Sequence, residues 1–196
     1  MKKFVSLLLV VVLAFGLLPL SAMAASETST LQQLENSIKE NSKAEIRDAE
    51  GNVLEVLDVN VQVQPLATRR SAEGTTYAIT CTAKSKDYHS GSANSGGIMA
   101  SATLVCTDVF GTENILHQVY GRWSGSASET RYRNVTYASY DTWDNEIDSA
   151  MYINVDQSFG YEPTDFIGYS FRVFTYAQVI SSGETLCLTV STDPNG

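Results

Sequence analysis

The sequence predicts an all-β fold: a sandwich of two antiparallel sheets with eight to nine short strands and a short N-terminal helix. A closed barrel is the second choice. Several runs alternate apolar with polar residues, as strands with one buried face do. Clusters of Gly, Ser and Asp separate these runs at regular spacing. Only the segment 25–41 has helical spacing of its apolar residues.

The first 24 residues have the pattern of a secretory signal peptide. Two lysines precede an apolar stretch at 4–20, and a small-x-small cleavage site ends at Ala24. An uncleaved membrane anchor is the alternative, which this cleavage site argues against. No later stretch approaches membrane-spanning length. We therefore expect a secreted, extracellular chain that begins at Ala25 and has no membrane span after cleavage.

The exported chain is acidic. The whole chain carries a formal charge of −9, and losing Lys2 and Lys3 with the signal peptide leaves −11. Nucleic acid and anionic lipid both need a positive field, so neither is expected as the main partner. The remaining length suits one domain. We expect a helical segment at 25–42, then a single sandwich domain at 43–196 with an exposed linker at 66–74.

The segment 25–41 is predicted to be a short helix. Ser29 and Thr30 are good N-caps, and Leu31, Leu34 and Ile38 form a narrow apolar stripe. So thin a stripe predicts a helix that packs lightly on the domain.

A hairpin is predicted at 44–64, with a turn at 48–52. In its second arm Leu57, Val59, Val61 and Val63 alternate with polar residues. Pro65 is expected to end this arm, because proline cannot donate to a ladder.

The segment 66–74 has the composition of a linker and contains the dibasic pair Arg69-Arg70. Two solvated arginines are one interpretation. The other is a processing site, which would make residues 25–70 a propeptide. The amphipathic strand before the pair argues against removal, because such a strand needs a sheet to cover it.

Two strands at 76–83 and 102–109 share a short pattern that turns a cysteine inward. We predict a Cys81–Cys106 disulfide between them and a free thiol at Cys187, through which the chain could dimerise. A Cys81–Cys187 bridge and three unpaired core cysteines are the alternatives.

Further strands follow along the chain. The composition of the segment 85–97, between the cysteine strands, predicts a long loop. The segment 169–180 is apolar on both faces, which predicts a central strand covered on both sides. The other strands are expected at 115–123, 130–139, 151–155 and 184–191.

An acidic loop follows the strand at 130–139. Asp141, Asp144, Glu146 and Asp148 lie within eight residues together with Asn145. Calcium prefers several such oxygens on a bending backbone, so this loop is the candidate calcium site. The spacing is not that of a twelve-residue calcium loop, and a solvated acidic turn is the alternative.

Three aromatic residues are candidate ligand contacts. Trp143, Tyr140 and Trp123 lie at predicted strand ends or in loops, where exposed rings stack on sugars or anchor protein partners. Trp143, inside the acidic loop, is the strongest of the three. Burial in the core is the alternative for each.

The sequence contains no Gly-x-Ser-x-Gly, phosphate-binding glycine loop, His-Glu-x-x-His or paired Cys-x-x-Cys motif. His89 and His117 are the two imidazoles. We therefore expect a secreted, non-catalytic binding domain for glycan, cell-wall material or protein, with no cofactor apart from the candidate calcium. The alternatives are a toxin-like or bacteriocin-like effector with residues 25–70 as a propeptide, and a hydrolase that uses His89.

Overall fold

The computed structural model describes residues 30–71, 74–85, 97–107, 113–124, 130–164, 166–180 and 182–193. The predicted signal peptide and His89 lie outside these ranges. The chain divides into two compact units, Met1–Leu34 and Glu35–Gly196. In the first unit, the described residues 30–34 begin a helix that runs over 30–41. No helix of the described residues is long and apolar enough to cross a membrane.

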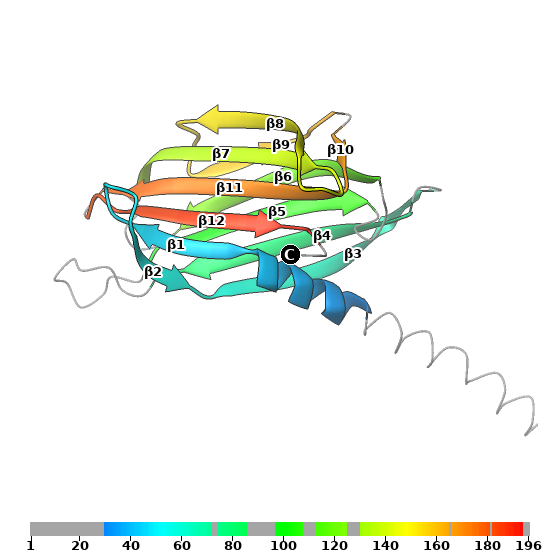
Figure 1. The fold of residues 1–196 in the computed structure, drawn as a ribbon, viewed down its shortest axis with the longest axis horizontal. Helices are drawn as coiled ribbons and strands as arrows, with labels where there is room; N and C mark the ends of the chain where they lie inside the picture. The colour runs from blue at the N-terminus through cyan, green and yellow to red at the C-terminus, as the bar shows by residue number, and fades with distance from the viewer. Residues whose placement is uncertain are drawn as a thin grey trace, which may run out of the picture. The chain divides into compact units, whose positions relative to one another are not determined.

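The predicted all-β sandwich is confirmed in the second unit, where two antiparallel sheets of six strands face each other (Figure 1). Sheet A has the strand order β2-β1-β12-β11-β7-β8. Sheet B has the order β10-β6-β5-β4-β3, with β9 also pairing with β6. The strands of sheet A are β1 (Lys43–Arg47), β2 (Val53–Leu57), β7 (Thr130–Tyr140), β8 (Glu146–Ile153), β11 (Ser170–Val179) and β12 (Thr185–Ser191). Those of sheet B are β3 (Val59–Ser71), β4 (Gly74–Lys84), β5 (Met99–Thr107), β6 (Asn114–Ser124), β9 (Ser158–Tyr161) and β10 (Ile167–Gly168).

The core lies between the two sheets, where β11 and β12 face β5 and β6. In the central strands of both sheets alternate residues point inward and are fully buried, among them Phe171 and Leu188 from sheet A and Leu104 and Trp123 from sheet B. Burying each such side chain contributes roughly 1.5–3 kcal/mol. The period-2 pattern of the sequence therefore specifies the fold class, because only one face of each strand has to be apolar.

The predicted hairpin forms as β1 and β2, but the alternating run that follows it belongs to both sheets. The chain leaves sheet A after Leu57 and enters sheet B at Val59. The prediction that Pro65 ends the strand was wrong. Pro65 lies within β3, opposite Tyr77, and an edge strand tolerates proline because its free side needs no donor.

The expected linker at 66–74 was also wrong. Strand β3 continues to Ser71, and Arg70 is paired with Thr75 across a hairpin to β4. A register shift separates this end of the hairpin from Pro65. The polar composition of the segment is that of an edge strand, which sequence alone does not distinguish from a linker.

Strand β11 is central, as predicted, between β12 and β7. The prediction that both its faces are covered was wrong. Phe171 and Val173 are buried in the core, whereas Arg172, Phe174 and Tyr176 point to the opposite side and keep some exposure. We call this side, turned away from sheet B, the outer face of sheet A.

The predicted Cys81–Cys106 disulfide is absent, and all three cysteines are free. Both thiols do point into the core from neighbouring strands, but Cys81 lies opposite Ala102, four residues from Cys106. That offset is about 13 Å along the strand, whereas disulfide Cα atoms lie within about 7 Å. The shared pattern predicted the face correctly but not the register.

Cys187 is a free thiol on the outer face of sheet A. It therefore lies on the far side of its sheet from Cys81, which excludes the alternative bridge within one sandwich. The side chain is 6% exposed between β1 and β11. Dimerisation through this thiol stays a prediction, and it would require the neighbouring side chains to move.

Candidate functional site

The predicted acidic loop is a tight turn that joins β7 to β8. The carboxylate of Asp141 accepts hydrogen bonds from the backbone N–H of Trp143 at 2.8 Å and of Asn145 at 2.9 Å, and from Nδ2 of Asn145 at 2.9 Å. These bonds lower the pKa of Asp141 because they favour its charged form, and the bond from the Asn145 side chain has the largest effect. Asp144 takes the left-handed conformation with φ of 65°. The turn is thus fixed by its own side chains.

The β1–β2 turn has the same design. Asp48 accepts hydrogen bonds from the backbone N–H of Asn52 at 2.7 Å and from its Nδ2 at 2.8 Å. Gly51 takes the left-handed position here, with φ of 88°. The shared signature is Asp, three residues, then Asn, with the left-handed residue just before the Asn. The acidic residue that begins each turn therefore has a structural role.

The four candidate calcium ligands do not converge on one point. Asp141 is engaged in the turn, and Asp144 forms an ion pair with Arg172 at 2.6 Å. Glu146 and Asp148 lie on β8, across a register shift in its pairing with β7. Among the described residues no group of three or more His, Cys, Asp or Glu side chains could hold a metal ion. Calcium binding stays a prediction that this geometry does not favour.

Arg172 connects the turn to the outer face of sheet A. Its guanidinium lies 4.4 Å from the centre of the Tyr140 ring and pairs with Asp144 at 2.6 Å and with Asp193 at 3.8 Å. Burial raises the pKa of Tyr140, while the nearby Arg172 opposes the rise. A cation held over a ring by two carboxylates is fixed in position, so this residue is a rigid part of the surface.

Beside Arg172 the outer face is hollowed over a volume of about 380 Å³. The end of the helix, β1, β11 and β12 all contribute to its lining. The polar groups come mainly from Asn41, Lys43, Arg172, Thr189, Ser191 and Asp193, and Phe174 adds an apolar side. Asn41 donates through Nδ2 to the carbonyl oxygen of Asp193 at 2.7 Å. Donors, acceptors and one aromatic ring thus line the same shallow surface.

The structure separates the three predicted ligand-contact aromatics. Trp143 is 82% exposed at the tip of the β7–β8 turn. Tyr140 is buried beneath Arg172. Trp123 is 1% exposed and packs on Phe159 with ring centres 5.3 Å apart, so its assignment as a ligand contact was wrong. It does lie near the end of a strand, β6, as predicted, but its side chain points to the inner face of the sheet.

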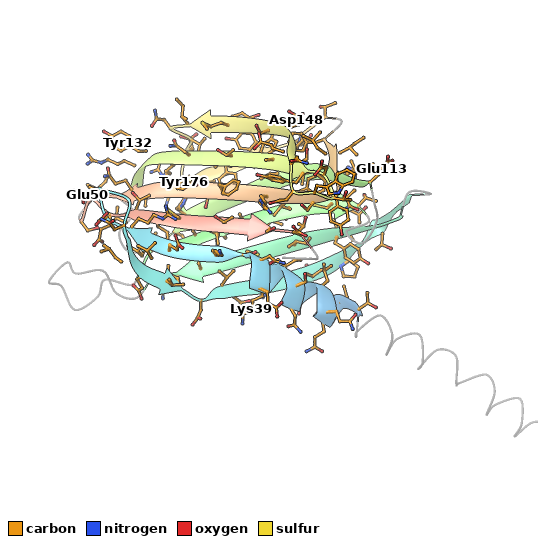
Figure 2. The ribbon with its side chains drawn as sticks, viewed as in Figure 1. Lys39, Glu50, Glu113, Tyr132, Asp148 and Tyr176 are labelled. Carbon is orange, nitrogen blue, oxygen red and sulfur yellow. The ribbon has the colours of Figure 1, made fainter. Side chains whose placement is uncertain are left out.

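Sequence reasoning did not identify Arg172, Phe174 and Lys43 as parts of one surface. They come from β11 and β1, which are far apart in the chain and separated in sheet A by β12. The sequence feature that could have indicated this surface is the second face of the segment 169–180, the face turned away from the core. We had expected that face to be covered. Figure 2 shows Tyr176 on this same outer face and Glu50 in the β1–β2 turn.

A second hollow of about 430 Å³ lies beside β6 and the segment that joins β9 to β10. His117 and Glu162 contribute to its lining. A hydrogen bond joins Nε2 of His117 to the Thr107 hydroxyl, which in turn bonds Thr76 at 3.0 Å. Gln118 donates to Glu162 at 3.1 Å. A threonine pair thus holds the imidazole. The Arg172 hollow gathers a cation, carboxylates and an aromatic ring on one surface, so it is the stronger candidate.

Comparisons of the chain with protein-family models, with curated protein sequences and with solved structures found no match. The function of the protein therefore has to be inferred from its own residues.

Proposed function

We propose that this chain is a secreted, non-catalytic domain that binds an extracellular glycan on the outer face of sheet A. The observation that carries the proposal is Trp143, an indole with 82% of its surface exposed at the tip of a hydrogen-bonded turn. Exposed aromatic rings on ordered turns serve as contact residues for ligands and partners. Sugars present flat C–H faces that stack on such rings.

The rigidity of the turn supports this assignment. The bonds to Asp141 fix the backbone of Trp143, and the pair formed by Asp144 and Arg172 joins the turn to the sheet. A contact residue that is already ordered loses less entropy when the ligand binds. The indole is therefore ready to act as a binding platform.

The neighbouring hollow supports a glycan over an ionic ligand. Lys43 and Arg172 are balanced by Glu40, Asp144 and Asp193 around the same surface. No strong field of one sign results, so neither an anion nor a cation is favoured. Hydroxyl and amide groups of Asn41, Thr189 and Ser191 suit the many hydroxyls of an uncharged sugar chain.

The effector alternative is less well supported. It requires the loss of residues 25–70, which include β1, β2 and nearly all of β3. Strand β1 covers the edge of β12, and β3 covers the edge of β4. Removal would expose two long strand edges. The hydrolase alternative depends on His89, outside the described residues, and stays testable through loss of any activity in His89→Ala.

The proposal is tested with the exported chain. Its intact mass should correspond to a start at Ala25, and a start after Arg70 would favour the effector instead. The same preparation is applied to a glycan array and to insoluble wall polysaccharides in a pull-down. Retention on at least one polysaccharide, released by the soluble sugar, is expected. Retention on none of them would refute glycan binding.

A further inference from the structure

Three large side chains form a line along β11 on the outer face of sheet A. Arg172, Phe174 and Tyr176 are two residues apart, so they share this face. Each step of two residues advances about 7 Å along a strand, and the whole line is therefore about 14 Å long. Phe174 is half-buried, and Tyr176, labelled in Figure 2, is 36% exposed. The line is longer than a single sugar ring.

Both neighbouring strands of β11 have smaller side chains beside this line. The residues in register with it are Ser191, Thr189 and Cys187 on β12, and Ala138, Thr136 and Asn134 on β7. Because these flanking side chains are short, the large side chains of β11 project further than their neighbours do. A flat ligand can therefore contact them from the solvent side.

Trp143 extends the line beyond its Arg172 end. The turn that carries Trp143 follows Tyr140, which pairs with Ser170, the first residue of β11. The ion pair of Asp144 with Arg172 at 2.6 Å holds this turn against the strand. We call Trp143, Arg172, Phe174 and Tyr176 together the β11 track.

Charges are balanced at both ends of the β11 track. Beside Tyr176, in register with it through Cys187, lies Glu45, which binds Arg47 at 2.6 Å. At the other end Arg172 is itself paired with carboxylates. The whole track therefore suits an uncharged chain and not only the hollow beside it.

We propose that the bound glycan is an internal stretch of a long, uncharged polysaccharide that runs along β11 from Trp143 to Tyr176. The inference rests on the proposed function and adds the length and direction of the ligand. Three rings and one guanidinium offer about four contact positions in a line, each about as large as one sugar. The rings at both ends are exposed, so the polysaccharide can continue past either end.

The direction along β11 provides more stacking contacts than the direction across the strands. A chain that crossed the sheet at Phe174 would pass Lys43 on one side and Met151 on the other. It would meet one aromatic ring on this path, whereas a chain along the strand meets three. Each additional stacked ring strengthens binding, so the lengthwise direction is favoured.

The first experiment measures Kd by calorimetry for fragments of increasing length, cut from the polysaccharide that retains the chain in the pull-down. Each additional stacking contact changes Kd about fivefold. Kd should therefore fall about 25-fold from two sugars to four, and change little beyond about five. On the long soluble polymer, more than two protein molecules should bind per polymer chain, because internal stretches outnumber ends.

The second experiment tests the direction with variants. Tyr176→Ala should raise Kd about fivefold for fragments of four or more sugars, and should leave Kd unchanged for two sugars, which Trp143 and Arg172 suffice to bind. Met151→Ala, on the same face but off the track, should bind every fragment normally. The matched control is Tyr120→Ala, a tyrosine 43% exposed on the outer face of sheet B, which should also bind normally. Circular dichroism verifies that the variants are folded.

Three results would overturn the inference and leave glycan binding intact. They are a Kd that does not depend on fragment length, a Tyr176→Ala variant that binds long fragments no more weakly than Tyr120→Ala does, and a loss for Met151→Ala that equals the loss for Tyr176→Ala. One or two protein molecules per long polymer chain would place the site at chain ends and overturn it as well. Retention on no polysaccharide at all is the separate outcome that refutes the proposed function.

Discussion

Truncating Trp143 should weaken glycan binding by an amount that follows from its exposure. The indole is 82% exposed, so a sugar can cover one whole face. One face is roughly 90 Å², about half of what an aromatic side chain buries when enclosed. At about 25 cal/mol per Å² this contact contributes about 2 kcal/mol. Trp143→Ala should therefore raise Kd roughly 30-fold.

The assay is isothermal titration calorimetry with a soluble oligosaccharide of the polymer that the pull-down retains. Trp143→Phe keeps a smaller ring and should lose less than Trp143→Ala. The control is Tyr132→Ala, which removes another ring, 61% exposed, from the start of β7. It should leave Kd unchanged. A loss under threefold for Trp143→Ala, or an equal loss for Tyr132→Ala, would refute the stacking argument.

Four further predictions concern the turns, the thiols and calcium. Asp141→Ala should weaken glycan binding, whereas Asp48→Ala should not, although each substitution removes the carboxylate that holds a similar turn. Equal Kd values for the two variants in calorimetry would show that the rigidity of the Asp141 turn does not contribute to binding. Burial raises the pKa of Cys187 from 9.0 to about 11 and that of Cys81 to about 12, so the folded state retains protons that the unfolded state loses. Below about pH 9 these thiols should not affect the free energy of unfolding. Between about pH 9 and about pH 12 the free energy of unfolding should fall, which urea denaturation at a series of pH values would measure. Native alkylation at pH 8 should leave all three thiols unmodified, whereas denatured protein should gain three alkyl groups by mass. Millimolar calcium should leave the melting temperature unchanged, and a rise that chelator reverses would restore the calcium site.

The fold class was predictable because it depends on a local pattern. Alternation along each strand specifies which side chains point inward, and Ile79, Cys81 and Leu104 are buried as that pattern predicts. Strand number was underestimated, since the residues that the structure describes form twelve strands rather than eight or nine. Polar edge strands such as the end of β3 lack an apolar face, and the switch between sheets after Leu57 leaves no mark in the alternation.

Register and long-range contacts were not predictable from the sequence. The distance between Cys81 and Cys106 depends on which residues of β4 and β5 pair, and the local pattern contains no such information. The contact of Arg172 with Asp144 depends on β11 lying beside β7, which sequence order does not specify. Trp143 could be singled out because it lies in a turn, where an indole has no core to enter.

The most direct test of the proposed binding surface uses the two tryptophans as internal reporters. The chain contains only Trp123 and Trp143, so its ¹H–¹⁵N spectrum should hold two indole N–H signals, which Trp143→Phe assigns. Titration with the retained glycan should shift the Trp143 signal and leave that of the buried Trp123 in place. Saturable binding that leaves the Trp143 signal unmoved would contradict the account.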